Sequence, residues 1–212
     1  MKIIFTSPFN PLWSEGVSKM ASLLEAEVVS IGNLLRAEVK SNTKLGKEIE
    51  TALYGGEILS ADIVSKLLLH RFFRDSARKI LVNYPINTMQ AESLVESMKK
   101  SEYGVTACVV VDSTKKVITR KFESQFHCAD PLHPSLESSA GIPECEVCGR
   151  PMIHSYDLSN DKVAYLIDSY FNENGVLSSA STLSEKLRVE TFWFTTPEEV
   201  VNQIQGLSHE NA

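Results

Sequence analysis

Short segments that are mainly apolar recur through the first half of the chain and alternate with helical patterns. The apolar segments span residues 2–6, 26–31, 79–82 and 105–112. Apolar residues at helical spacing occupy residues 14–25, 32–39, 45–54, 61–73 and 88–99. A strand that is apolar along its whole length is typical of a parallel sheet, which is buried on both faces. The alternation therefore predicts an α/β fold, a doubly wound parallel sheet covered by helices.

The pattern is interrupted between residues 122 and 156, a segment that is rich in Pro, His, Cys and Ser and has no long apolar period. Beyond it we expect a helix, a strand and a helix, at residues 161–171, 189–194 and 197–206. We therefore predict a core α/β domain made of residues 1–121 and 157–212, with residues 122–156 as a small inserted lobe. A chain of 212 residues can bury one substantial core with such an insertion.

The inserted segment contains residue types that bind zinc. Cys145 and Cys148 are two residues apart and are followed by a glycine, and Cys128 and His133 precede them. Three thiolates and one imidazole satisfy tetrahedral zinc, and four protein ligands are typical of a closed structural site. A short lobe with few apolar residues needs a cross-link to stay folded, and a metal would serve. We predict a structural zinc site formed by these four residues.

Other interpretations of the same residues stay open. The cysteines of the Cys-x-x-Cys motif could instead be a redox pair, although such a pair is expected at a strand–helix junction rather than in a Pro-rich loop. His127 competes with His133 as the imidazole ligand, and Asp130 and His154 are weaker candidates. Cys108 lies within an apolar segment and is predicted to be a core residue.

Composition excludes several classes of function. The net charge of −6 argues against a nucleic-acid-binding protein, which normally carries a basic patch. The short basic run of Lys115, Lys116, Arg120 and Lys121 is better explained as a solvated face. No segment has the roughly 18 consecutive apolar residues of a membrane span, and residues 1–5 do not resemble a signal peptide. We expect no nucleic-acid or membrane partner and a cytoplasmic location.

Several short motifs follow one another in the order and spacing of a known family. They are Ser30–Arg36 (SIGNLLR, against the family's STGDLLR), Leu45–Lys47, Gly56–Leu59 with Asp62–Val64, and Tyr84–Pro85 with Gln90–Ala91. With these motifs the chain resembles the adenylate kinases, in their long form with a zinc-binding lid. The resemblance implies a P-loop nucleoside-monophosphate-kinase-like fold. It also implies that residues 32–62 form a helical monophosphate-binding lobe and that residues 122–156 form the zinc-binding lid.

The phosphate-binding loop of that family is not preserved. The family has Gly-x-Pro-Gly-x-Gly-Lys-Gly-Thr after its first strand, so that backbone N–H groups and a lysine hold the phosphates. The corresponding segment, Thr6–Ser14, reads TSPFNPLWS. Leu12 replaces the lysine, Phe9 and Trp13 add bulk, and Pro11 lacks an N–H donor. Only Ser14, aligned with the hydroxyl that helps to hold Mg²⁺, keeps its chemistry.

The charged residues that the family uses for transfer are largely missing as well. The family's Asp-Gly-Phe-Pro-Arg is replaced by Val82–Ile86, and its lid and hinge arginines by Gln125, Ser155 and Leu166. Lys121 stands where the family stacks an arginine on adenine. Phosphoryl transfer depends on positioning and electrostatic stabilisation, so these losses predict a degenerate member without catalytic residues.

The monophosphate side matches the family better. Arg36, Gly32, Leu59 and Gln90 stand at positions that hold a nucleoside monophosphate, and with Lys121 they are the predicted nucleotide-binding residues. Arg36 could pair with a phosphate and Gln90 could read a purine edge. Alternatively, Arg36 is a surface residue and Gln90 a helix cap.

Two functions remain as hypotheses. The first is a catalytically defective, zinc-stabilised scaffold or regulator that binds AMP or another purine nucleotide, or a protein partner. The second is an active, divergent nucleoside-monophosphate kinase that transfers phosphate between ATP and AMP, using Ser14, Arg36, Lys121 and Lys19. Mg²⁺ is expected only if a nucleoside triphosphate binds.

Overall fold

A five-stranded parallel sheet lies at the centre of the computed structural model, which describes residues 1–7, 13–55, 59–99, 101–111, 113–138, 140–154 and 160–210. Its strands are β1 (Lys2–Thr6), β2 (Glu27–Ser30), β3 (Lys79–Val82), β4 (Ala107–Val110) and β8 (Glu190–Trp193). They are arranged in the order β2-β3-β1-β4-β8, and every pair is parallel. The central strand β1 is buried along its length, and its middle residues Ile3–Phe5 are apolar, because both faces of the sheet are covered.

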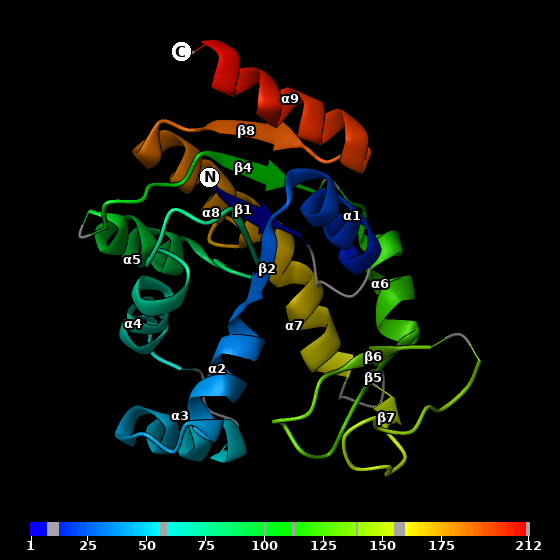
Figure 1. Cartoon of the computed structure of the whole chain (residues 1–212). Coiled ribbons are helices and arrows are strands. Elements are labelled where there is room, and N and C mark those ends of the chain that lie inside the picture. Colours follow the sequence, from blue (N-terminus) through cyan, green and yellow to red (C-terminus); the bar gives the residue numbers. More distant parts are fainter. Residues whose placement is uncertain are drawn as a thin grey trace.

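Helices cover the two faces of the sheet, and each face has its own core (Figure 1). On one face lie α1 (Ser14–Leu24) and α9 (Pro197–Glu210), which pack over Ile3 and Phe5. On the other lie α4 (Ala61–Arg71), α5 (Thr88–Met98) and α8 (Val176–Leu187), which pack over Ile4. Successive residues of β1 thus point to opposite cores, and the predicted doubly wound α/β fold is confirmed.

Two helices after β2 form a lobe beside the sheet, which we call the α2–α3 lobe (Figure 1). They are α2 (Ile31–Lys40) and α3 (Lys44–Gly55), and Leu35 and Ile49 form a small core with Leu67 of α4. Gly46 lets the two helices approach closely, since a Cβ there would lie 2.5 Å from the carbonyl oxygen of Glu38. Leu59 packs against this core and against the core of the sheet.

A three-stranded antiparallel sheet forms the outer part of the inserted segment. Its strands are β5 (Gln125–His127), β6 (Leu136–Glu137) and β7 (Ile153–His154), in the order β6-β5-β7. Helices α6 (Lys115–Glu123) and α7 (Asn160–Phe171) connect it to the central sheet. In Figure 1 this sheet lies at the opposite side of the molecule from α9 and faces the α2–α3 lobe. We call residues 125–154 the lid.

Several predicted elements need correction. Helix α8 was not expected; four serines and a threonine among its twelve residues weaken the helical signal, and packing against α5 and the sheet compensates. Helix α9 continues to Glu210, beyond the expected end at residue 206. The basic run that begins at Lys115 needs no correction: it lies on helix α6, and Lys115 and Lys116 are exposed, as predicted for a solvated face. The phosphate-loop residues Phe9, Pro11 and Leu12 lie outside the described residues. No helix in the described part of the chain is long and apolar enough to cross a membrane.

Candidate metal centre and nucleotide cleft

Two loops of the lid bring three cysteines and a histidine together. Cys128 follows β5, and His133 lies in the turn after it. Cys145 and Cys148 lie in a tight turn in which the backbone N–H of Gly149 donates to the carbonyl of Cys145, 2.7 Å away. Gly149 has φ +68°, a left-handed conformation that glycine adopts without steric cost.

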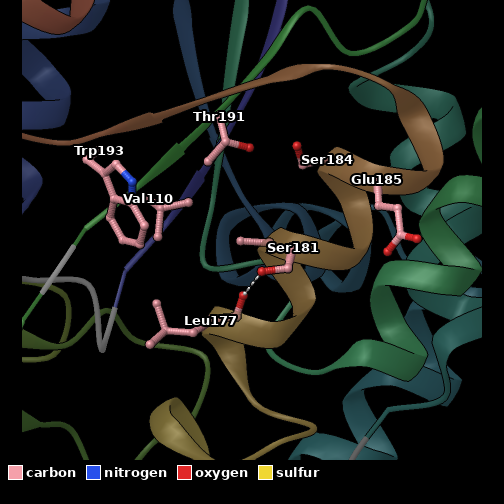
Figure 2. A pocket seen from close by; sticks show the side chains of 8 residues that line it. Val110, Leu177, Ser181, Ser184, Glu185, Thr191 and Trp193 are labelled. Atoms are coloured by element: carbon pink, nitrogen blue, oxygen red, sulfur yellow. Dashed lines mark hydrogen bonds between the residues drawn. The ribbon is translucent and has the colours of Figure 1, made fainter.

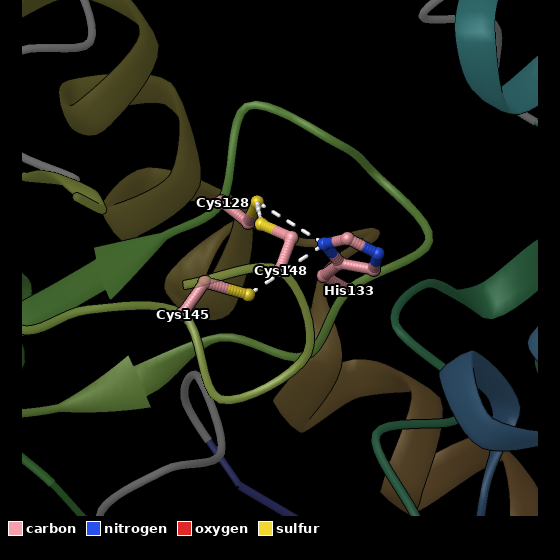
Figure 3. Close-up of side chains that lie close together, drawn as sticks. All are labelled: Cys128, His133, Cys145 and Cys148. Atoms are coloured by element: carbon pink, nitrogen blue, oxygen red, sulfur yellow. Dashed lines mark hydrogen bonds between the residues drawn. The ribbon is translucent and has the colours of Figure 1, made fainter. Parts of the chain in front are cut away.

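The side chains of these four residues point toward one another (Figure 3). Their ligand atoms all lie within 4.8 Å of one another. Cys128 Sγ is 3.7 Å from Cys148 Sγ and 3.3 Å from His133 Nδ1, and Cys145 Sγ is 3.5 Å from that nitrogen. Around tetrahedral zinc, ligand atoms would be separated by about 3.8 Å between sulfurs and about 3.6 Å between sulfur and nitrogen. The cluster therefore has the ligand types and the spacing to hold a metal ion.

The surroundings of the cluster favour the thiolate form of Cys148 and place a carboxylate beside His133. A hydrogen bond from the Arg150 side chain lowers the pKa of the Cys148 thiol to about 6, so this residue is a thiolate at neutral pH. The thiolate is the form that binds metals. His133 Nε2 lies 3.7 Å from Asp130 Oδ2, and a carboxylate on the outer nitrogen orients a ligating imidazole. His127 and His154 lie on β5 and β7 and are not in the cluster of described ligand atoms.

A cleft of about 400 Å³ separates the metal-cluster loops from the α2–α3 lobe. Its lining is formed by Asn33, Arg36, Ala37, Lys40, Asp130, Leu132, His133, Pro134 and Val147. Arg36 and Lys40 are four residues apart on α2 and so share one helix face. At the far end of the lobe, the hydroxyl of Tyr54 lies 3.4 Å from a carboxylate oxygen of Asp130. The lid and the lobe therefore meet across the cleft.

Arg36 is held at the edge of this cleft by its own helix. Its Nη2 donates to the Asn33 side-chain oxygen, 2.6 Å away. A Cβ at Gly32 would lie 3.3 Å from both Nη atoms, so the glycine leaves room for the guanidinium. Partial burial lowers the pKa of Arg36 from its ordinary value, but a guanidinium stays protonated at neutral pH. The structure thus brings together two of the five predicted nucleotide-binding residues.

The other three predicted nucleotide-binding residues, Gln90, Leu59 and Lys121, are not among the described residues that line the cleft. Gln90 is buried at the start of α5, where Asn87 caps its backbone N–H at 2.8 Å and its own Oε1 accepts from the backbone N–H of Ile86 at 3.0 Å. Its carbonyl end is therefore engaged in the turn, and the amide nitrogen is the group left for a purine. Leu59 precedes α4, and Lys121 lies on α6, with a side chain outside the described residues.

Comparison with known proteins agrees with the α/β fold of the central sheet and its helices. A family model described as adenylate kinase matches residues 16–201. The chain belongs to the adenylate kinase family. It is 29% identical to an adenylate kinase of Nitrosococcus oceani, over 76% of this chain and 68% of the relative. It is also 29% identical to a mitochondrial GTP:AMP phosphotransferase of Saccharomyces cerevisiae, over 72% of this chain and 76% of the relative.

Buried polar groups without a partner lie near the carboxyl ends of β1 and β4 in this adenylate kinase family member. Ser7 Oγ, Trp13 Nε1 and Ser113 Oγ are buried and have no hydrogen-bond partner among the described residues. The Trp13 ring packs edge-on against Phe194, with ring centroids 5.8 Å apart, and Phe194 packs in turn on Phe5. Trp13 thus joins the core between the sheet and α9.

The structure adds cleft residues that were not singled out from the sequence. Lys40 could have been found from its helical spacing to Arg36. Asp130 was considered only as a metal ligand, whereas it lies beside His133 and contacts Tyr54. Nothing in the local sequence links Tyr54 with Asp130, because 76 residues separate them.

Proposed function

We propose that this protein is a catalytically defective adenylate kinase homologue, a zinc-stabilised regulator that binds AMP or another purine nucleotide between α2 and the lid. The observation that carries the proposal is the cleft itself. It presents two cations of the monophosphate side, Arg36 and Lys40, to a space of about 400 Å³. A guanidinium pairs with phosphate through two parallel hydrogen bonds, and a neighbouring ammonium adds charge.

The loss of transfer chemistry is inferred from what replaces the family's charged groups. Leu12 stands in place of the phosphate-loop lysine and Ile86 in place of an arginine. Ile86 is 49% exposed and cannot stabilise a moving phosphoryl group. One such cation is worth roughly 10³–10⁵ in rate, so losing several would remove useful turnover. Mg²⁺ would matter only if a nucleoside triphosphate binds.

Zinc is the metal that best suits the four-residue cluster. Three sulfurs and an imidazole nitrogen are soft and borderline ligands, and a complete protein set of four leaves no open position for catalysis. The residues that would hold it are Cys128, His133, Cys145 and Cys148. In this role zinc would hold the lid folded and would take no part in a reaction.

Calorimetric titration of the zinc-loaded protein with AMP, ADP and ATP, each with and without Mg²⁺, tests the proposal. We expect AMP to bind, and Arg36→Ala to weaken it at least tenfold, since one charge-assisted pair contributes about 1.5–3 kcal/mol. Arg71→Ala, an exposed arginine at the end of α4, is the control and should bind AMP as the native chain does. Absence of binding across the panel would contradict the nucleotide part and leave a protein scaffold.

The second candidate is an active, divergent phosphotransferase, and the unpaired donors at Ser7, Trp13 and Ser113 are what favour it. Donors at the carboxyl edge of a parallel sheet can bind a phosphate. Against it, Lys19, one of the proposed substitute cations, is paired with Glu198. Formation of ADP from ATP and AMP, lost in Arg36→Ala, would establish this candidate and refute the first.

A further inference from the structure

A second cavity, of about 540 Å³, lies between α8 and the edge strand β8 (Figure 2). It is lined by Val110, Leu177, Ala180, Ser181, Ser184, Glu185, Thr191 and Trp193. We call it the edge groove. It shares no residue with the cleft beside α2 and opens on the face of the sheet that carries α5 and α8. Its volume is within the range of small-molecule sites.

One wall of the edge groove is a flat aromatic surface. Trp193, the last residue of β8, is 57% exposed, which is unusual for the largest apolar side chain. Leu177 and Ala180 of α8 and Val110 of β4 supply apolar surface next to it. A ligand with an apolar body would therefore remove both its own surface and that of Trp193 from water.

Two serine hydroxyls and one carboxylate of the groove offer a ligand only lone pairs or negative charge. Ser181 Oγ donates its hydrogen to the carbonyl of Leu177 at 3.4 Å, and Ser184 Oγ donates to that of Val189 at 2.9 Å. Each hydroxyl therefore has only lone pairs left to offer a ligand. Glu185 is the one charged residue among the described lining, and no ion pair within the described chain involves it. The neighbouring Lys186 is already paired with Glu92, 2.8 Å away.

Thr191 adds an unmet hydrogen bond. Its hydroxyl is buried in the wall of the groove and has no hydrogen-bond partner among the residues that the structure describes. A buried hydroxyl without a partner costs roughly 1–3 kcal/mol. A polar ligand atom that reached this hydroxyl would relieve that cost, which neither Ser181 nor Ser184 does in the free protein.

We infer that the edge groove binds a small organic cation, an amine or guanidinium that carries an apolar body. Trp193 and Glu185 lie at opposite sides of the groove (Figure 2), so the apolar body would lie against the indole ring while the cation pairs with the carboxylate and the hydroxyl lone pairs. Since no cationic side chain lines the groove, phosphates and carboxylates are disfavoured. The site is independent of nucleotide binding because it is built from different elements.

The test uses the whole chain labelled with 5-fluorotryptophan, in which Trp13 and Trp193 give one ¹⁹F resonance each. Trp193→Phe assigns the two resonances, and Trp13, packed against Phe194, is the internal control. We expect 4-phenylbutylamine to shift the Trp193 resonance saturably at millimolar concentration, while 4-phenylbutyrate, of the same body and opposite charge, shifts neither. Equal binding of the acid and the amine, or no saturable shift with the amine, would overturn the inference.

Two variants test the named partners. Glu185→Gln keeps the shape of the side chain and removes its charge at an exposed position. It should weaken the binding of 4-phenylbutylamine at least threefold. Thr191→Val replaces the unpaired hydroxyl by a methyl group and should weaken it by a smaller factor without lowering thermal stability. Unchanged affinity in Glu185→Gln would refute the role of charge. Tighter binding of N-acetyl-lysine methylamide than of 4-phenylbutylamine would indicate that the groove binds a lysine side chain of a partner protein. That result would overturn the inference that the ligand is a free small molecule.

Discussion

Asp75 is shared by two lysines at the amino ends of neighbouring strands. Lys2 of β1 and Lys79 of β3 are in register, and their side chains are only 1% and 5% exposed. The Asp75 oxygens lie 3.3 Å from Lys2 Nζ and 3.0 Å from Lys79 Nζ. Backbone carbonyls of Ala77 and Arg71 accept one further hydrogen bond from each ammonium. Removing one member of such a group leaves buried charge uncompensated.

Asp75→Asn should therefore lower the thermal unfolding midpoint by several degrees at pH 7. The hydrogen bond from Lys79 lowers the pKa of the Asp75 carboxyl below its ordinary value of 3.8. A lowered folded-state pKa gives stability that is complete above pH 3.8 and is lost as pH falls through the folded-state value. The native chain should lose this part of its stability below pH 3.8, and the variant should not. Asp168→Asn, which breaks the exposed pair with Lys115, is the control and should shift the midpoint little.

Cys145→Ser should reduce bound zinc to well below one equivalent and destabilise the lid, because the cluster then lacks a ligand. Metal analysis of protein purified without added zinc measures the first effect, and thermal unfolding measures the second. Cys108→Ala is the matched control: Cys108 lies in β4, fully buried, and burial raises the pKa of its thiol to about 12. It should keep a full equivalent of zinc. Full zinc in Cys145→Ser would contradict the assignment of this ligand.

At the scale of elements, continuous apolar strands were predictable and serine-rich helices were not. β1 and β3 contain the apolar runs Ile3–Phe5 and Ile80–Val82, because the middle of a strand covered on both faces is buried on both sides. Helix α8 has buried serines, and Ser179 Oγ bonds backbone carbonyls of Val176 and Pro85 at 2.6 and 3.3 Å. Such tertiary contacts have no trace in local periodicity.

In the candidate site, too, some features could be predicted from the sequence and others could not. The three cysteines could be selected from ligand type and spacing, whereas the choice of His133 over His127 needed the structure. The engagement of Gln90 by Ile86 could not be foreseen, since it depends on the turn that follows β3. The edge groove was not predicted either, because it depends on α8 and on which face of β8 remains uncovered.

Two glycines, one where a Cβ would clash and one where a Cβ would meet nothing, give a paired prediction. A Cβ at Gly175, which begins α8, would lie 2.1 Å from the carbonyl oxygen of Ser169, so Gly175→Ala should destabilise the chain by roughly 1–3 kcal/mol. Gly206, exposed within α9, has nothing within 4 Å of its missing Cβ, and Gly206→Ala should stabilise by roughly 0.5–1 kcal/mol. Urea unfolding of both variants measures the signs. Equal signs would show that α8 does not begin as described.

At the scale of the molecule there are three parts: the central sheet with its helices, the α2–α3 lobe and the lid. The lobe and the lid lie on the same side of the central sheet and face each other (Figure 1). The lid has its own small core of Phe126, Cys128, Cys145 and Met152, half of which is metal-cluster residues. An apolar core this small does not suffice without a metal. The contact of Tyr54 with Asp130 links the lid to the lobe.

Metal removal should therefore loosen the lid and spare the sheet. After chelation we expect backbone amides of residues 125–154 to exchange with deuterium at least tenfold faster, while amides of β1, β3 and β4 keep their rates. Hydrogen exchange read by mass spectrometry on chelated and zinc-loaded protein measures this. Exchange that accelerates equally in the sheet would show that lid and core unfold as one unit.

The order of strands in the sheet bears on how the chain is made. β1 is synthesised first, yet its partners β3 and β4 begin 77 and 105 residues later, with Lys2 opposite Lys79 and Ile3 opposite Ala107. The final edge strand arrives only after the lid has left the ribosome. Strand β1 therefore stays unpaired until β3 is made at residues 79–82, and the lid can capture zinc before the sheet is complete. Of the five strands of the central sheet, β8 emerges last and forms the edge groove, so the groove cannot form until the other four strands have been made.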